Sequence, residues 1–176
     1  AVPIESLHAM EVLQQHSFIV LAYPVQFSNA PVMVRDFIQR YSSLWKGKRV
    51  LCVATMGLFS GDGAGWSARL LKKCGAKVVG GLHIHMPDSV CDVKLLKKSV
   101  EQNKEIVKAA DKKIEETAEK IRKGEYPHDG IHFYDQIAGL LGQRLWCYGK
   151  TKDYSGGLKI GAECIGCGLC EKLCPM

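Results

Sequence analysis

The sequence predicts an α/β protein with a parallel sheet, followed by a small cysteine-rich module. Two observations lead to this fold class. Continuous apolar runs alternate with helical patterns over the first 125 residues, which is typical of a parallel sheet with crossover helices. Four of the eight cysteines then crowd into the last thirteen residues, where their close spacing is typical of a metal centre rather than of a disulfide framework.

Composition limits the classes that need to be considered. The 176 residues are 47% hydrophobic and 24% charged, which excludes a disordered or collagen-like chain. The formal charge of +6 is spread along the chain, so we expect no nucleic-acid partner. No apolar stretch reaches the roughly 18 residues of a membrane span, and the N-terminus has no basic segment before an apolar run. We therefore expect a cytoplasmic protein.

Three strands are expected, at residues 18–23, 50–55 and 77–86. The first two are unbroken apolar runs, as in strands that are buried on both faces of a parallel sheet. Residues 1–4, Ala-Val-Pro-Ile, look like one more strand of the same sheet.

Helices are expected between and after these strands. Residues 32–41 and 66–74 carry apolar side chains at helical spacing, and both suit crossover helices. The clearest helix runs from about residue 93 to residue 123, where basic side chains in the last turn precede Gly124. Its charged side is interpreted as a solvated face.

Ligands of an open parallel sheet bind beyond the carboxyl ends of its strands. The loops there, residues 23–31 and 55–65, each combine an aromatic ring, Phe27 or Phe59, with small residues. Two interpretations remain open. The two rings hold a flat heteroaromatic group whose polar edge meets backbone amides, or the loops are turns with buried aromatics.

The last cysteines form the pattern C-x2-C-x2-C-x3-C-P, from Cys164, Cys167 and Cys170 to Cys174. This is the spacing of bacterial ferredoxins, and Gly166 and Gly168 let the chain turn tightly around a cluster. Zinc is the alternative, but zinc modules usually separate two C-x2-C pairs by a dozen or more residues. The spacing therefore predicts a 4Fe-4S cluster.

The fourth cysteine of such a run ligates the other cluster in two-cluster ferredoxins. The sequence stops at Met176, directly after Cys174 and Pro175. We therefore expect a truncated chain in which Cys164, Cys167 and Cys170 serve one cluster and Cys174 serves a second. The four isolated cysteines are interpreted as small buried hydrophobes.

The two loops and the cysteine run together resemble flavodoxin–ferredoxin fusion proteins of anaerobic prokaryotes, over nearly the whole chain. The resemblance implies a flavodoxin-like doubly wound parallel sheet that binds FMN, followed by a ferredoxin-like module with two 4Fe-4S clusters in the full-length protein. The residues it implies at the flavin are Pro24, Val25, Gln26, Phe27, Ser28, Asn29, Thr55, Met56, Gly57, Leu58, Phe59, Gly61 and Asp62.

The front of the chain departs from this family. Nothing before Phe18 supplies the first strand or the loop that cradles the FMN phosphate on a helix N-terminus. We expect that about 30 residues, one strand–helix unit, are missing. A fragment of this kind should bind FMN weakly or not at all.

Three regions follow from this interpretation: a flavodoxin-like domain at residues 1–125, a connector at 126–158, and the first half of a ferredoxin-type domain at 159–176. Within the connector, residues 131–148 predict a short amphipathic helix, which Gly139 and Gly142 weaken. That helix either packs between the modules or lies on a membrane surface.

Other candidate sites have fewer supporting residues. His83 and His85 share one face of a strand, as a metal pair does, but the sequence places no third ligand beside them. Asp88, Cys91 and Asp92 are expected to cap the long helix. No nucleophile elbow and no phosphate-binding loop of the Walker type is present.

We expect an electron-transfer protein that exchanges electrons with redox partner proteins, rather than a stand-alone enzyme. Two alternatives stay open. One is a flavin-dependent reductase of quinones that uses NADH or NADPH and receives electrons through the ferredoxin module. The other is a front domain without flavin that serves as a docking scaffold for the clusters.

Overall fold

The computed structural model describes residues 1–88, 94–145 and 159–173. Within them, three parallel strands form one sheet in sequential order, β1 (Phe18–Pro24), β2 (Arg49–Met56) and β3 (Lys77–His85). The three strands predicted from apolar runs are confirmed, and their ends differ from the prediction by no more than a residue or two. The chain is an α/β protein.

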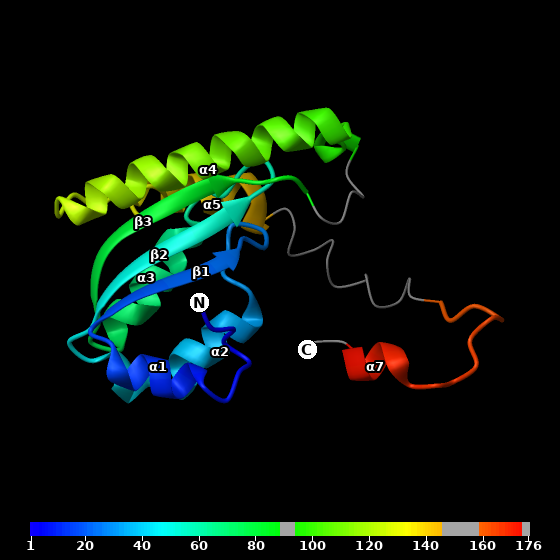
Figure 1. Ribbon diagram of the computed structural model, residues 1–176, viewed down its shortest axis with the longest axis horizontal. Helices are drawn as coiled ribbons and strands as arrows, with labels where there is room; N and C mark the ends of the chain where they lie inside the picture. Colours follow the sequence, from blue (N-terminus) through cyan, green and yellow to red (C-terminus); the bar gives the residue numbers. More distant parts are fainter. Residues whose placement is uncertain (89–93, 146–158, 174–176) are drawn as a thin grey trace.

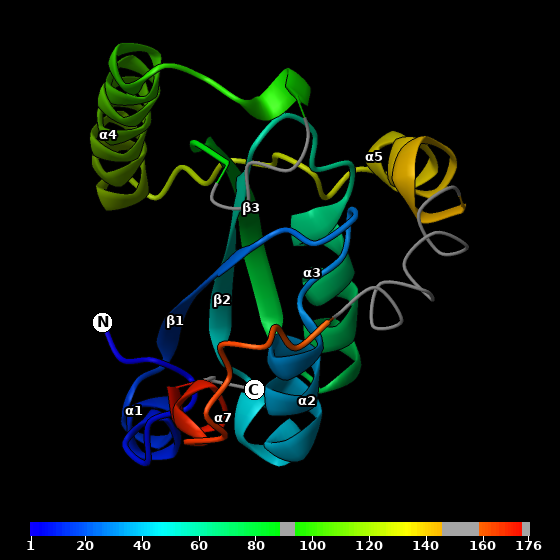
Figure 2. The same cartoon turned by 90° about the vertical axis from the view of Figure 1, so that its right-hand side faces the viewer.

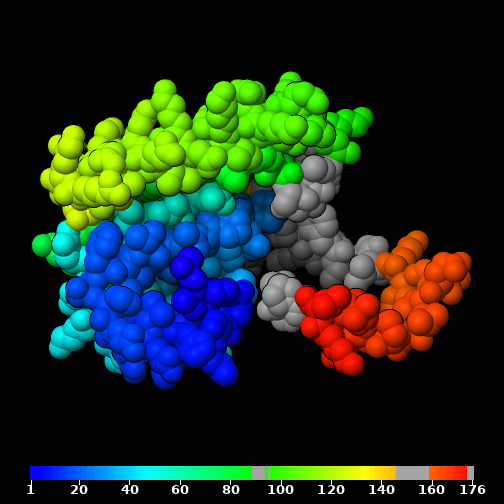
Figure 3. Space-filling model, in the orientation of Figure 1, coloured from blue at the N-terminus to red at the C-terminus, as the bar shows by residue number. Residues whose placement is uncertain are grey.

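Helices cover the two faces of the sheet unequally. Helices α2 (Val32–Arg40) and α3 (Gly63–Lys73) lie on one face, and α4 (Val100–Arg122) lies on the other (Figures 1 and 2). The larger core lies under α2 and α3, where Ile38, Trp45 and Leu71 are fully buried. A smaller cluster under α4 contains Leu82, Ile84 and Ala110. The side chains of α4 form a continuous layer along one side of the molecule (Figure 3).

The front of the chain differs from the prediction. Residues 1–4 form no strand, and a turn in which the Ser6 amide donates to the Pro3 carbonyl leads into α1 (Ala9–Gln15) instead. The prediction was wrong because Pro3 has no amide hydrogen for a strand ladder. Helix α1 was not predicted, although its buried residues, Ala9 and Leu13, have the spacing of one helical face.

The long helix begins later than predicted. Ser99 is its N-cap, because its hydroxyl accepts from the Gln102 amide while the Gln102 side chain accepts from the Ser99 amide. The cap expected at Asp88 is therefore wrong, and the alternatives Cys91 and Asp92 lie outside the described residues. A short helix, η2 (Lys94–Leu96), precedes the cap. The predicted end at Gly124, with φ +82°, is confirmed.

Helix α3 starts earlier than predicted, at Gly63. Two residues of its first turn must be glycine, because neighbouring atoms leave no room for a side chain. A Cβ on Gly63 would lie 2.5 Å from Val25 Cγ2, and one on Gly65 would lie 2.4 Å from the Gly130 carbonyl oxygen. The glycines that a sequence pattern assigns to a loop therefore allow the helix to approach its neighbours closely.

The two edges of the sheet are not alike. Residues 126–131, which we call the strap, run beside β3: the Gly81 amide donates to Pro127 (2.9 Å) and the Asp129 amide donates to Gly81 (2.8 Å). On the other side, β1 pairs only with β2 among the described residues, and its Val20 side chain is 53% exposed.

The remaining helices follow the strap. The helix predicted within residues 131–148 is present as α5 (Phe133–Gly139), which continues as a π-helical segment, η3 (Leu140–Arg144). The described part of the cysteine module contains α7 (Leu169–Leu173).

Candidate functional site: the loops at the carboxyl edge of the sheet

The loops that follow β1 and β2 lie side by side at the carboxyl edge of the sheet. The amide of Val25, just after β1, donates to the carbonyl of Thr55 in β2 over 2.8 Å. The amide of Met86, just after β3, donates to Met56 over the same distance. The strand ladder therefore extends into the loops and fixes where they begin.

The first loop turns on two residues with left-handed backbone. Gln26 and Asn29 exchange two hydrogen bonds of 2.9 Å, and the residues between them, Phe27 and Ser28, have φ of +50° and +56°. This matches a type I′ turn, which normally contains glycine or asparagine. The turn leaves the Phe27 ring 47% exposed and buries the Ser28 side chain completely. Strained backbone of this kind persists where the surrounding structure holds it, often at functional sites.

The second loop divides into an exposed and a buried half. Leu58 and Phe59 are exposed, whereas Ser60, Gly61 and Asp62 are buried. Gly61 has φ +53°, a conformation that glycine adopts at little cost. The exposed half presents the Phe59 ring to solvent, and the buried half anchors the loop.

The segment of α5 and η3 packs onto both loops. The Ser28 hydroxyl donates to Gln143 Oε1 over 2.7 Å. A Cβ on Gly61 would lie 2.5 Å from Gly139 Cα, and one on Gly142 would lie 3.3 Å from the Phe59 ring. The two glycines that weakened the helix prediction are the residues that let the helix approach the loops.

Asp62 is the electrostatic centre of this packing. Its carboxylate is fully buried and accepts from Arg69 Nη2 at 2.5 Å and from Arg144 Nη2. The Arg144 guanidinium also donates to the Gln136 carbonyl at 3.1 Å, and its Nε is buried without a partner among the described residues. Two guanidinium groups stabilise a carboxylate that burial alone would make costly.

His83 forms a second polar centre below the loops. Its Nε2 lies 3.1 Å from the Ser60 hydroxyl, and a Cβ on Gly130 would lie 2.1 Å from the same atom. Burial lowers the pKa of His83 and outweighs the opposing effect of Asp129. The folded chain therefore favours the neutral imidazole.

Lys113 joins the strap to β3 next to this histidine. Its ammonium donates to the His83 carbonyl at 2.8 Å and to Asp129 Oδ2 at 2.9 Å. Partial burial raises the pKa of Asp129, but the hydrogen bonds from Lys113 and from the His83 amide outweigh it and leave the pKa lowered. His85, which shares a strand face with His83, contacts the Gly57 carbonyl.

The residues expected at a flavin are spread over all levels of exposure. Pro24, Gln26, Phe27, Leu58 and Phe59 are exposed; Val25, Asn29, Thr55, Met56 and Gly57 are half-buried; and Ser28, Gly61 and Asp62 are buried. Two of these, Ser28 and Asp62, already bond to η3. The roles of Gln143 and Arg144 were not predicted, because no sequence pattern connects them to loops so far away in the chain.

The loops retain features that fit a flat heteroaromatic ring. Phe27 and Phe59 have exposed faces, and the buried Asn29 Oδ1 has no hydrogen-bond partner within the described part of the chain. A ring bearing an N–H at its edge would satisfy that oxygen. The Asp62 carboxylate, in contrast, is already fully occupied by arginines.

The cysteine module presents its described thiols to solvent. Cys164, Cys167 and Cys170 are free and exposed, and Gly166 and Gly168 both have φ +67°. This is the tight turning that the sequence predicted. Across residues 1–88, 94–145 and 159–173, no three His, Cys, Asp or Glu side chains gather closely enough to hold a metal ion. Cys174 lies outside the described residues.

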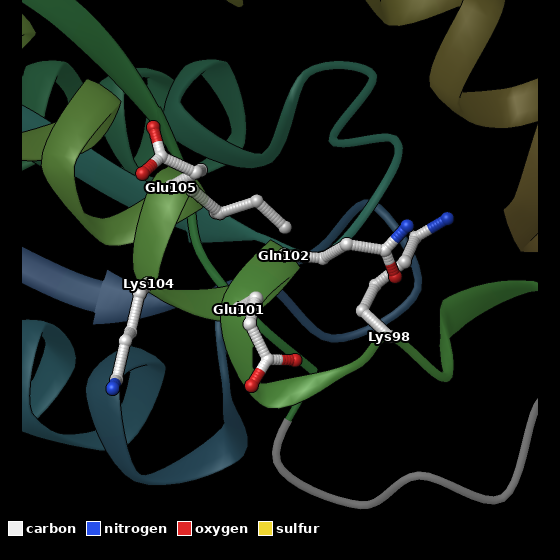
Figure 4. A pocket seen from close by; sticks show the side chains of 6 residues that line it. Lys98, Glu101, Gln102, Lys104 and Glu105 are labelled. Atoms are coloured by element: carbon white, nitrogen blue, oxygen red, sulfur yellow. The ribbon is translucent and has the colours of Figure 1, made fainter.

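A shallow depression lies elsewhere, along the start of α4. Its lining includes Lys98, Glu101, Gln102, Lys104 and Glu105 (Figure 4). A surface hollow lined mainly by exposed charged and polar chains does not have the apolar enclosure that is typical of a ligand pocket.

The fold and the site together define an α/β protein with exposed aromatic side chains on the loops at the carboxyl edge of a parallel sheet. A scan of protein-family models and a search of curated proteins find no match to the chain. No helix in the described ranges has the length and apolar character needed to cross a bilayer.

Among solved structures, one match is described as an NADPH-quinone reductase from P. pentosaceus. It shares 14% identity, with a TM-score of 0.37, over 62% of this chain and 72% of its own. A likeness at this level carries no argument about activity.

Proposed function

We propose that this chain is a cytoplasmic iron–sulfur electron-transfer protein. In this proposal its α/β domain is flavodoxin-like and binds FMN, and its C-terminal module is ferredoxin-like and holds 4Fe-4S clusters. The observation that carries the proposal is the run of cysteines from Cys164 to Cys174 with the spacing of bacterial ferredoxins. Redox proteins are the partners that this function requires.

The local backbone supports cluster binding. Gly166 and Gly168 in left-handed conformation turn the chain between successive cysteines, and such turns can direct backbone amides at an anionic centre. The thiols of Cys164, Cys167 and Cys170 are free and exposed, so an incoming cluster can reach them. Thiolates are the ligands that iron–sulfur clusters use.

The loops at the carboxyl edge supply a place for the flavin ring. Phe27 and Phe59 would flank the ring, and Asn29 Oδ1 would accept a hydrogen bond from its edge. Asp62 and Ser28 act indirectly, because their bonds to Arg144 and Gln143 fix the loops that carry the aromatics. Bound FMN supplies exchange of one or two electrons, and a bound cluster supplies exchange of one.

The metal content of the chain purified without oxygen tests the iron–sulfur assignment. We expect iron and acid-labile sulfide in matching amounts. Cys167→Ala should lower both, whereas Cys74→Ala removes a half-buried thiol of the sheet domain and should leave both unchanged. Zinc without sulfide would overturn the proposal and leave the cysteines as a structural clip.

A titration with lumiflavin tests the flavin assignment, because this ring system lacks the phosphate that a separate loop would hold. We expect Phe27→Ala and Phe59→Ala each to weaken binding. Phe133→Ala is the matched control, since that ring is exposed but lies outside the two loops. Equal binding by all four proteins would remove the flavin from the proposal.

The open enzyme alternative predicts steady-state oxidation of NADH or NADPH with a quinone acceptor. An electron carrier instead needs a protein partner for turnover. The two are separated by assaying the cluster-loaded chain with nicotinamide and quinone alone.

A further inference from the structure

Helix α5 and the π-helical segment η3 are turned the opposite way from an ordinary surface helix. The residues that contact the loops are small or polar: Gly139 is buried, and Gln143 bonds to Ser28. Their large apolar residues face solvent with exposures from 43% to 75%. These residues are Phe133, Tyr134, Ile137, Leu140 and Leu141, together with Leu145, which directly follows η3. A helix that packs normally buries its apolar side.

The exposed apolar surface continues onto the neighbouring loops. The Phe59 ring lies against Gly142, with 3.3 Å to a Cβ built there, and Phe27, Leu58 and Phe59 are themselves 40% to 62% exposed. We call Leu58 and the six residues above the apolar face, which Phe27 and Phe59 adjoin. Exposed apolar patches formed by several neighbouring side chains mark contact with a partner or with a membrane.

Lysines border this face on the side of η2. Lys94, Lys97 and Lys98 are exposed, and Leu96 between them lies 3.7 Å from a Cβ built on Gly57, next to Leu58. Figure 2 shows this short helix and α5 on either side of the loop after β2. The Lys98 side chain extends away from Glu101 and Lys104, which point the other way (Figure 4).

The two charged side chains of α5 and η3, Asp135 and Arg144, have partners of their own within the chain. Asp135 accepts a hydrogen bond from the His132 amide at 3.0 Å. Arg144 is engaged with the buried Asp62. An apolar centre bearing aromatic rings, beside a cluster of exposed lysines, is the arrangement that binds the headgroup region of an anionic membrane.

We propose that the apolar face lies on an anionic lipid surface, with Lys94, Lys97 and Lys98 at the headgroups. The inference does not rest on the proposed electron-transfer function. Lipid binding needs neither FMN nor a cluster, so the two proposals fail separately.

Flotation of the full chain with lipid vesicles tests the proposal. We expect binding to vesicles of mixed phosphatidylcholine and phosphatidylglycerol, weaker binding to phosphatidylcholine alone, and weakening of the first by salt. Leu141→Asp should reduce binding to both. Leu7→Asp is its matched control, because Leu7 is 91% exposed on the far part of the chain, before α1.

The basic edge is tested by charge reversal. Lys97→Glu with Lys98→Glu should weaken binding to the anionic vesicles by about tenfold or more, with little effect on neutral vesicles. Lys120→Glu, on the last turn of α4, is the control. Urea unfolding of each variant confirms that the fold is retained.

Three results would overturn the proposal. One is no flotation with either vesicle. Another is concentration-dependent dimerisation that Leu141→Asp abolishes while vesicle binding is absent, which would assign the face to a second copy. The third is vesicle binding that appears only after residues 159–176 are removed, which would assign the face to the cysteine module.

Discussion

Arg144 and Asp62 form an ion pair although 82 residues separate them in the sequence. Asp62 closes the loop after β2, and Arg144 ends η3. The pair therefore connects the sheet domain to the segment that leads toward the cysteine module. Because the Asp62 side chain is fully buried and that of Arg144 is only 17% exposed, solvent screens their interaction little.

Loss of this pair should cost stability. Arg144→Ala is expected to lower the free energy of unfolding by about 1–3 kcal/mol, since Asp62 keeps only Arg69 as a partner. Urea unfolding measures the change. Arg122→Ala breaks the exposed pair with Glu119 and should have no measurable effect. Equal stability of the two variants would show that α5 and η3 are not held through Asp62.

Gly139→Ala tests whether α5 packs on the loops, because the sign of the change in stability differs between a packed helix and a free one. In a free helix the change stabilises by about 1 kcal/mol. Here the new Cβ would lie 2.5 Å from Asp62 Oδ1, so we expect destabilisation of about 1–3 kcal/mol. Gly142→Ala is the control, because its Cβ meets only the Phe59 ring, at 3.3 Å. Stabilisation by both substitutions would contradict the packing of α5 on the loops.

The stability of the chain should fall in mild acid because of His83. Burial lowers the pKa of this histidine in the folded state below its ordinary value of about 6.5, so the unfolded chain binds more protons. Its contribution is complete above about pH 6.5 and is lost as the pH falls from there toward the lower pKa of the folded state.

His83→Gln should flatten this dependence, measured as the free energy of unfolding between about pH 7.5 and pH 5. His16→Gln, at an exposed histidine, should leave it unchanged. The lowered pKa of Asp129 acts only in stronger acid, below about pH 4, so the two effects occur in separate ranges. An unchanged slope in His83→Gln would assign the acid sensitivity to other groups.

The cysteines should differ sharply in reactivity. Burial raises the pKa of Cys52 to about 12, so almost no thiolate is present at neutral pH and iodoacetamide should not modify it. Cys164, Cys167 and Cys170 are exposed and should react in the metal-free chain. Mass spectrometry of the digested protein identifies the labelled positions. Protection of the three after treatment with iron and sulfide is the expected result, and their unchanged labelling would count against cluster binding.

The sequence predicted the sheet well because its first two strands are continuous apolar runs. The second strand of the prediction contains Val50, Cys52 and Ala54, and all three are fully buried. The start of the long helix was predicted too early, because apolar residues also precede Ser99, the residue that caps the helix. Hydrophobic periodicity shows which face is buried, whereas side-chain capping decides where the helix begins.

The candidate site was predicted only in part. The loops with Phe27 and Phe59 follow from strand order, because parallel strands bring their carboxyl ends to one edge. The partners of Asp62 and Ser28 come from η3, and no local pattern in the sequence relates residues so distant. The glycines of α5 and η3 look unfavourable for a helix when considered locally, and only the contact with Gly61 and Phe59 explains them.

The two edges of the sheet differ in whether another strand can pair with them. The strap already takes the hydrogen bonds of β3 at Gly81, so a further strand cannot pair with β3 at that residue. Beside β1 the ladder is open among the described residues, with Val20 exposed on that strand. Addition of a strand is therefore a one-sided process in this protein, and edge-to-edge association of several copies would stop at pairs instead of propagating into fibres.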